Sequence, residues 1–417
     1  MARRKQEITD LDFYQLKAGK VWQHFKGESF AFWMICAYLF FEYVRPQSIV
    51  KAIDILPWTQ LAIVGAFLGC LSDKTVKWVS SPVNVLLLLY LVIILLSSIN
   101  AYFPGVSYEN LRNYYLWVII YFLIINIVNT RRRFFIFLCI FLLASFKISL
   151  SLAITWAQRG FSFTSWGLSG PPGFFQNSGE LAIQMLVFWP IALAFATALK
   201  PYVSQWWYRA LLMMPVTAIM VILGSSSRGG QLALVVQLIV MSYRSIFRPK
   251  VLMTIGVSLF LIWQLLPEEQ KERFEGMGED RTSQQRILYF ENGVDMIKDH
   301  PFLGVGFFNF RQYFDLYYPE DALFGRAELP HNIFIQVGTD AGLIGLFIFS
   351  LLVFYSLRIP RSVDTCNDDE RRVGLAKYGN ISVFGFLVAG QFVTVAYYPY
   401  FWIHLSLLVA MKNSFSK

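Results

Sequence analysis

Residues 83–99, VNVLLLLYLVIILLSSI, contain no charged side chain, and their polar groups are limited to Asn84, Tyr90, Ser97 and Ser98. A helix of about 20 mostly apolar residues crosses the hydrocarbon core of a bilayer, and a shorter one suffices where neighbouring helices shield its ends. Similar runs recur before and after this one along most of the chain. The sequence therefore predicts a membrane protein with many spans.

Composition agrees with this prediction. Of 417 residues, 56% are hydrophobic and 15% are charged, whereas about 25% are charged in an ordinary soluble domain. The net charge of +9 would suggest a nucleic-acid partner in a soluble protein, but the basic residues lie between apolar runs, where they set membrane orientation. No arginine–aromatic recognition module stands out, so we expect no nucleic-acid partner.

Twelve apolar runs are predicted to span the membrane. They lie at residues 29–44, 56–71, 83–99, 114–128, 134–157, 180–198, 206–223, 231–243, 251–266, 333–357, 379–396 and 399–411. The predicted organisation is a cytoplasmic tail over 1–28 with an interfacial amphipathic helix, spans one to nine over 29–266, a large loop over 267–332, three spans over 333–411 and a cytoplasmic tail over 412–417.

The distribution of basic residues predicts which side each segment faces. With the N-terminus in the cytoplasm, most lysines and arginines fall on that side, including the triplet at residues 131–133. The loop 267–332 then lies outside; it carries seven lysines and arginines, but long loops cross the membrane largely regardless of charge. Both termini are therefore expected in the cytoplasm and the large loop on the opposite face.

Soluble-enzyme motifs are absent from the sequence. There is no phosphate-binding loop, HExxH, GxSxG or dinucleotide fingerprint, and the four cysteines form no CxxC pair or cysteine–histidine zinc pattern. We expect no cofactor and no metal. Lys147 interrupts the fifth run, and a cation there should face the bundle interior or water. It could line a site or pair with a carboxylate such as Glu180, and the residues alone do not decide.

The first polar cluster of the predicted outer face is GSSSRGG at residues 224–230. Glycines let a backbone approach a ligand closely, and hydroxyls with free N–H groups at the start of the next helix favour an anion. Arg228 adds a planar guanidinium that fits phosphate oxygens. A tight turn whose arginine extends to lipid headgroups is the other interpretation, and both stay open.

The second cluster is RTSQQRILYF at residues 281–290. Thr282 or Ser283 is expected to cap a helix that carries Arg286 and Tyr289 on one face. The apolar stripe of that helix is predicted to comprise Ile287, Phe290, Val294 and Ile297. The alternative is a surface arginine on an amphipathic loop helix.

The third cluster contains His331, within the segment LPHN at residues 329–332. Of the four histidines, this one lies where the outer loop re-enters the membrane. An imidazole with a pKa near 6.5 can accept a proton at neutral pH. A histidine that merely caps the following helix is the alternative.

With these clusters identified, the chain resembles the O-antigen ligase superfamily of integral-membrane glycosyltransferases, which includes O-antigen polymerases and O-oligosaccharyltransferases. The matching segments are GFFQN at 173–177, the 224–230 segment, the arginine-bearing helix with HPFLGVGFFNF at 300–310, and PHNIFIQVGTDAGLIG at 330–345. Residues 42–58, EYVRPQSIVKAIDILPW, are similar to the O-glycosylation ligase subgroup. The resemblance implies an all-α polytopic GT-C-like fold of about 12 transmembrane helices, with short helices in a large periplasmic loop.

The resemblance also implies an activity. The donor would be an undecaprenyl-diphosphate-linked glycan, used without metal at the periplasmic face of the bacterial inner membrane. Arg228 and Arg286 would hold the donor diphosphate, and His331 would be the general base. Further substrate contacts are expected from Gln176, Asn177, Gln285, Tyr289 and Asn332.

The expected acceptor is a hydroxyl of lipid A-core or of another surface molecule. A polymerase that uses a second lipid-linked repeat unit, or a protein O-oligosaccharyltransferase, would share the donor chemistry. A lipid or glycan transporter would spread charged residues through mid-span positions, whereas the polar clusters here gather at one face of the predicted bundle.

Overall fold

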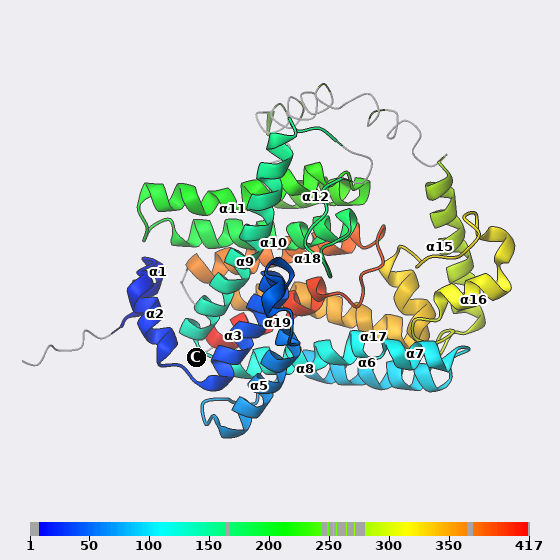
Figure 1. The fold of residues 1–417 in the computed structure, drawn as a ribbon, viewed down its shortest axis with the longest axis horizontal. Helices are drawn as coiled ribbons and strands as arrows, with labels where there is room; N and C mark the ends of the chain where they lie inside the picture. The colour runs from blue at the N-terminus through cyan, green and yellow to red at the C-terminus, as the bar shows by residue number, and fades with distance from the viewer. Residues whose placement is uncertain are drawn as a thin grey trace, which may run out of the picture.

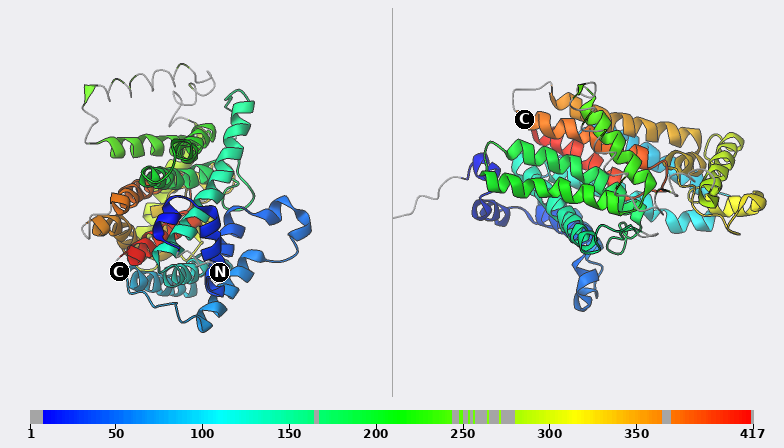
Figure 2. Two further views of the ribbon diagram at one scale, coloured as in Figure 1. Left: turned by 90° about the vertical axis from the view of Figure 1, so that its left-hand side faces the viewer. Right: turned by 90° about the horizontal axis from the view of Figure 1, so that it is seen from above.

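The computed structural model describes residues 8–163, 167–243, 280–364 and 370–415, and the single positions 248, 249, 253, 256, 264 and 271. All regular structure in these residues is helical. The helices form an elongated bundle, with α1 (Asp10–Tyr14) and α2 (Ala18–Lys26) at one end and α15 (Arg281–Asp299) and α16 (Phe310–Tyr317) at the other (Figures 1 and 2).

The remaining elements follow in chain order. The first half holds α3 (Phe30–Tyr43), α4 (Pro46–Ile49), η1 (Lys51–Ile53), α5 (Trp58–Ser72), α6 (Pro82–Ile99), α7 (Pro104–Asn110), α8 (Arg112–Ile127) and α9 (Arg131–Gln158). The second half holds α10 (Ser178–Leu199), α11 (Gln205–Gly224), α12 (Arg228–Ser242), η2 (Pro319–Asp321), α17 (Ile333–Asp364), α18 (Glu370–Ala389) and α19 (Pro399–Phe415).

The all-α, many-helix class predicted from the sequence is confirmed. Helices lie at eleven of the twelve predicted positions, and the ninth, 251–266, lies almost wholly outside the described residues. By length and composition, α6, α9, α10, α11 and α17 are long and apolar enough to cross a membrane, five in the described part of the chain. The total of twelve spans and the periplasmic position of the loop stay predictions.

Helix α10 lies at the centre of the bundle, where it packs against α11 and α18. Gln237 of α12 is fully buried between these helices. Its side chain accepts a 2.7 Å hydrogen bond from Trp189 Nε1 and donates 2.8 Å hydrogen bonds to the carbonyls of Leu186 and Ile381. Polar side chains that bond across apolar helix contacts fix which helices are neighbours, so this amide joins α10, α12 and α18.

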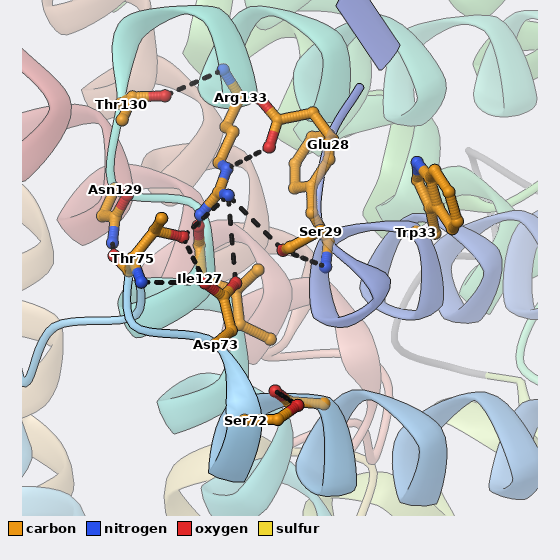
Figure 3. A network of polar contacts seen from close by, with 12 residues as sticks. Glu28, Ser29, Trp33, Ser72, Asp73, Thr75, Ile127, Asn129, Thr130 and Arg133 are labelled. Atoms are coloured by element: carbon orange, nitrogen blue, oxygen red, sulfur yellow. Dashed lines mark hydrogen bonds and ion pairs between the residues drawn. The ribbon is translucent and has the colours of Figure 1, made fainter. Parts of the chain in front are cut away.

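A second polar network surrounds Arg133 at the end of the bundle that carries the termini (Figure 3). Its side chain is 5% exposed, and its Nε donates a 2.7 Å hydrogen bond to Glu28. The other guanidinium nitrogens donate to the carbonyl of Ile127 at 3.1 Å and to the hydroxyl of Thr75 at 2.9 Å. From the sequence, this arginine is predicted to help set the membrane orientation. In the structure its buried side chain also connects α9 to the α2–α3 junction and to the loop after α5.

Replacing Arg133 by alanine should lower the free energy of unfolding by about 3–5 kcal/mol, because the largely buried carboxylates of Glu28 and Asp73 both lose this cation and Glu28 retains only His24 as a partner. Arg131 is the matched control, since its guanidinium lies 5.5 Å over the Phe415 ring near the surface, a contact worth about 0.5–1 kcal/mol. Thermal unfolding of the two purified variants measures the difference. Equal losses would contradict a clamping role for Arg133.

Three sequence predictions about local structure are wrong. Asp280, not Thr282 or Ser283, caps α15, because its carboxylate accepts from the Ser283 N–H at 3.0 Å. The predicted apolar stripe of α15 is wrong only in its first half: Ile287 and Phe290 are 51% and 50% exposed, whereas Val294 and Ile297 pack into a small core with Tyr289 and Met296. The predicted span 379–396 ends as a helix at Ala389, and residues 390–398 form a loop.

The loop 390–398 docks against the start of α17 through its backbone. The Ile333 N–H donates to the carbonyl of Gly390 at 2.8 Å, and the Ala396 N–H donates to the Gln336 side chain at 3.0 Å. These hydrogen bonds satisfy backbone groups that a helix would have paired internally. The loop therefore forms a fixed wall beside residues 329–333.

Candidate functional site

Arg228 is the first residue of α12, directly after the junction with α11. The Ser227 hydroxyl accepts from the Gly230 N–H at 3.2 Å, and the Ser225 hydroxyl donates to the Ile222 carbonyl at 2.7 Å. A Cβ on Gly229 would lie 2.7 Å from the side chain of Phe392. The two serines and Gly229 therefore form the tight turn between α11 and α12. Of this segment, Arg228 is the residue whose side chain could bind an anion.

The Arg228 guanidinium turns toward the N-terminus of α15. Its Nη1 lies 3.4 Å from the Asp280 carboxylate, and the two side chains are 31% and 38% exposed. The Asp280 pKa is lowered by its hydrogen bonds from Ser283 and by the charge of Arg228, against the effect of burial. An ion pair this exposed contributes little to stability.

Arg286 lies on α15, half-buried and close to Arg228. Its Nε is buried without a hydrogen-bond partner among the described residues. Burial and then the charge of Arg228 lower the pKa of Arg286, and the carboxylates of Asp280 and Glu328 act in the opposite direction. Arginine stays protonated under such shifts. Two adjacent cations with an unsatisfied donor favour a ligand that carries more than one negative charge.

His331 lies between α15 and the loop 390–398, in a left-handed backbone conformation with φ 51°. Its N–H donates to the Thr394 hydroxyl at 2.8 Å, and its ring stacks on Tyr289 with centroids 6.4 Å apart. Asn332 caps α17, because its Oδ1 accepts from the N–H groups of Phe334 and Ile335. His331 is therefore not the helix cap, and its imidazole is held by other contacts.

The His331 side chain meets Glu328, three residues before it. Its Nε2 lies 3.2 Å from Glu328 Oε2. Burial first, and then the charge of Arg286, lower the pKa of His331, while the Glu328 carboxylate raises it. The net direction is downward from 6.5, so the imidazole is mostly neutral near pH 7 and can accept a proton.

Three predicted substrate contacts instead hold the frame of this site. Gln285 donates to the Asp321 carbonyl at 2.9 Å and accepts from the Leu323 N–H at 2.6 Å. The Tyr289 hydroxyl accepts from the Glu328 N–H at 2.6 Å. The remaining amide group of Asn332 donates to Gln391 at 2.9 Å. These side chains fix the segment that carries Glu328 and His331.

The other two predicted contacts lie at the start of α10. Gln176 and Asn177 are exposed, and Asn177 forms a capping box with Glu180. A Cβ on Gly179 would lie 3.1 Å from Val393 and 3.8 Å from the Ser227 hydroxyl. The start of α10 is therefore beside the start of α12, and both amides border the Arg228 side of the site.

Lys147 does not join this cluster. It lies on an exposed face of α9, and among the described residues no hydrogen bond or ion pair links it to Glu180 or to another carboxylate. Of the two expected environments, the bundle interior is therefore not the one that Lys147 faces, because the inward face of α9 is taken by Ser145, Ile148 and Ser149.

Asp280 and Glu328 are the site residues that the sequence predictions missed. Asp280 could have been recognised as a helix cap directly before the predicted helix. Glu328 carries no comparable signal, because its position beside the imidazole depends on the turn that places His331. Among the described residues, no group of three or more histidine, cysteine, aspartate or glutamate side chains is arranged to hold a metal ion.

Replacing Glu328 by glutamine should move the acid limb of the pH–rate profile to lower pH, because the carboxylate that raises the pKa of His331 is lost while Arg286 still lowers it. The acid limb reports protonation of the essential base. Glu320 is exposed in the same loop, so Glu320→Gln should leave the limb in place. If the acid limb of Glu328→Gln stayed at the wild-type pH or moved to higher pH, Glu328 would not be the group that raises the pKa of His331.

The described residues form a many-helix protein with candidate membrane spans, in which two neighbouring arginines lie close to a histidine. A family model described as Wzy_C, O-antigen ligase, matches residues 213–350, a range that includes all three of these residues. The match supports membership of the O-antigen ligase family and confirms the resemblance noted in the sequence. The match supports an O-antigen ligase- or polymerase-like glycosyltransferase at the family level. No curated protein matches the chain.

Proposed function

We propose that the protein transfers a glycan from undecaprenyl diphosphate to an acceptor hydroxyl on lipid A-core or another surface molecule. One observation carries the proposal: Arg228, Arg286 and His331 come from three separate elements, yet Arg286 lies within electrostatic range of both of the others. Helix α15, which carries Arg286, lies at the end of the bundle opposite α1 and α2 (Figure 1). This arrangement suits a diphosphate and a hydroxyl that react beside a membrane surface.

The arginines would stabilise the leaving group. The bond between the anomeric carbon and the diphosphate oxygen breaks, and the diphosphate gains negative charge as it leaves. Fixed guanidinium groups aimed at that oxygen lower the barrier, because they need no reorganisation when the charge develops. The buried Nε of Arg286 has no hydrogen-bond partner among the described residues, so it can donate to the leaving group.

His331 would remove the proton from the acceptor hydroxyl as its oxygen attacks the anomeric carbon. Glu328 contacts Nε2, so it orients the ring and stabilises the imidazolium that forms. The diphosphate bound by Arg286 would also offset the charge that lowers the His331 pKa. The pKa of His331 would therefore rise when the donor binds, and the imidazole would be a stronger base in the complex than in the free protein.

The orientation of the protein is part of the proposal. We infer that α1, α2 and the C-terminus face the cytoplasm of the bacterial inner membrane and that α15 and α16 lie in the periplasm. The basic triplet at residues 131–133 lies at the former end, as the positive-inside rule requires. A lipid carrier in the membrane would then reach the site between helices.

The test is reconstitution of the purified full chain with an undecaprenyl-diphosphate-linked glycan and lipid A-core, without nucleotide. We expect a glycosylated acceptor and free undecaprenyl diphosphate in equal amounts. Lengthened lipid-linked glycan in place of that product would make the protein a polymerase, and a glycosylated peptide would make it a protein O-oligosaccharyltransferase. Movement of the intact lipid-linked glycan across vesicles without bond cleavage would overturn the proposal in favour of transport.

A further inference from the structure

Arg45 occupies an unusual backbone position between α3 and α4. Its φ and ψ are 51° and 54°, in the left-handed region, which costs a non-glycine residue free energy and persists only where surroundings fix it. Here the Ser48 hydroxyl and N–H donate to the Arg45 carbonyl at 2.8 Å and 3.0 Å. The following proline also restricts the chain, so the direction of the Arg45 side chain is set by its backbone.

The Arg45 guanidinium lies directly over Gly173. A Cβ at residue 173 would overlap Arg45 Nη1 and Cζ, and Gly173 itself has φ 102°. The turn is held in place by aromatic packing, because the Phe174 ring lies 5.2 Å from that of Tyr398 and the Phe175 ring lies 5.4 Å from that of Tyr43. Only glycine leaves room for the guanidinium at this rigid position.

One donor of the Arg45 guanidinium is left unsatisfied by the part of the chain that the structure describes. Its Nε is buried with no hydrogen-bond partner among the described residues. Glu42 attracts it electrostatically but also interacts with Thr59, and no ion pair within 4.0 Å joins Glu42 to Arg45 in the described part of the chain. A buried donor without a partner is costly, which points to an anion that completes the site.

The position of Arg45 relates it to the reaction centre. The loop 390–398 contacts His331 through Thr394 and contacts the turn at Phe174 through Tyr398. Arg45 is therefore on the loop side of His331, whereas Arg286 meets the imidazole from α15. The donor diphosphate is already matched by the two arginines near α15, so Arg45 is suited to a different anion on the acceptor side.

The segment after Arg45 indicates what kind of molecule carries this anion. Ile49, Val50 and Ile55 are 60%, 49% and 80% exposed, and exposed apolar side chains beside a cation favour a lipid with an anionic headgroup. Building on the proposed function, we propose that Arg45, seated over Gly173, binds a phosphate of the glycolipid acceptor. The contact holds the acceptor so that its sugar hydroxyl reaches His331.

Kinetics with lipid A-core as acceptor test this role. Arg45→Asn keeps a residue that tolerates the left-handed backbone and removes the charge, so the acceptor KM should rise about 10- to 100-fold. The donor KM and kcat at saturating acceptor should change less than about threefold. Arg159, an exposed arginine at the end of α9, is the matched control, and Arg159→Ala should leave all three constants unchanged.

A double-mutant cycle and a dephosphorylated acceptor separate binding from folding. Gly173→Ala should displace the guanidinium and raise the acceptor KM by itself, yet add little when combined with Arg45→Asn, because both changes remove one contact. Dephosphorylated lipid A-core should be a poor acceptor for the wild type and no worse for Arg45→Asn. Additive effects of Gly173→Ala and Arg45→Asn, or an acceptor KM that stays at the wild-type value, would overturn the proposal.

Binding without turnover keeps this inference distinct from the proposed function. Native mass spectrometry of the full chain measures how much lipid A, or phosphatidylglycerol, stays bound. Arg286→Ala should bind lipid A as the wild type does, whereas the lipid A bound by Arg45→Asn should fall at least about tenfold. That pattern would support the anion site even if no glycan were transferred. If Arg45→Asn lost lipid A and phosphatidylglycerol equally, the site would bind bulk phospholipid. If its binding of lipid A were unchanged, Arg45 would have a structural role only. Either result would overturn the acceptor assignment.

Discussion

Replacing Arg286 by alanine should lower the rate of glycan transfer by about 100- to 1,000-fold, as loss of one fixed electrostatic contact to a developing charge commonly does. The effect should be large because Arg286 contributes an unpaired buried Nε and lies between Arg228 and His331. The measurement is product formation by purified protein at saturating donor and acceptor. Arg228→Ala should be impaired in the same direction, but less, because that guanidinium already shares its charge with Asp280.

Arg281 provides the matched control on the same helix. Its guanidinium lies 5.0 Å over the Phe324 ring and donates to the Leu323 carbonyl at the exposed start of α15, so Arg281→Ala removes a charge from the same region but leaves Arg228, Arg286 and His331 in place. We expect its rate within about threefold of the wild type. Arg286→Ala at the wild-type rate, or equal losses in both variants, would show that Arg286 does not meet the leaving group.

His331→Ala should lower the rate by about 100- to 10,000-fold, the range typical of general base catalysis. In the proposed mechanism the imidazole takes the hydroxyl proton, and Glu328 would not replace it because a carboxylate is a weaker base. Single-turnover transfer measures the chemical step directly. Donor affinity should be nearly unchanged, since the two arginines remain.

His300 serves as the control for loss of a histidine in the same domain. Its Nε2 lies 3.1 Å from the Tyr313 hydroxyl at the end of α15, away from the arginines. His300→Gln should keep near-normal transfer. If His331→Ala transferred glycan at the wild-type rate, His331 would not be the general base. The proposed role of Arg228 and Arg286 would not be affected by that result.

The sequence predicts the helices well because burial in a bilayer leaves long apolar runs, such as residues 83–99, that few other structures require. It also predicts Arg228, Arg286 and His331 as candidates, because isolated cations and an imidazole at the ends of such runs are unusual, and the structure brings these three residues together. The structure shows in addition that the side chains of Gln285 and Asn332 form hydrogen bonds to backbone groups. Their residue types alone do not predict these bonds.

Other features depend on contacts between distant segments and could not be predicted. Ile287 and Phe290 fit an apolar stripe, but the packing of α15 against α16 and α17 selects the Tyr289 face instead. The loop after Ala389 looks like a continuing span until the hydrogen bond from Ile333 to Gly390 is seen. Glu328 becomes a partner of His331 only through the turn at residues 329–331.

The most direct test of the account is a structure of the full chain with undecaprenyl diphosphate bound in a lipid nanodisc. We expect both phosphates between the guanidinium groups of Arg228 and Arg286, with Asp280 displaced and the His331 imidazole facing the phosphate that bore the glycan. A diphosphate bound at the α1–α2 end, or one that contacts neither arginine, would contradict the account.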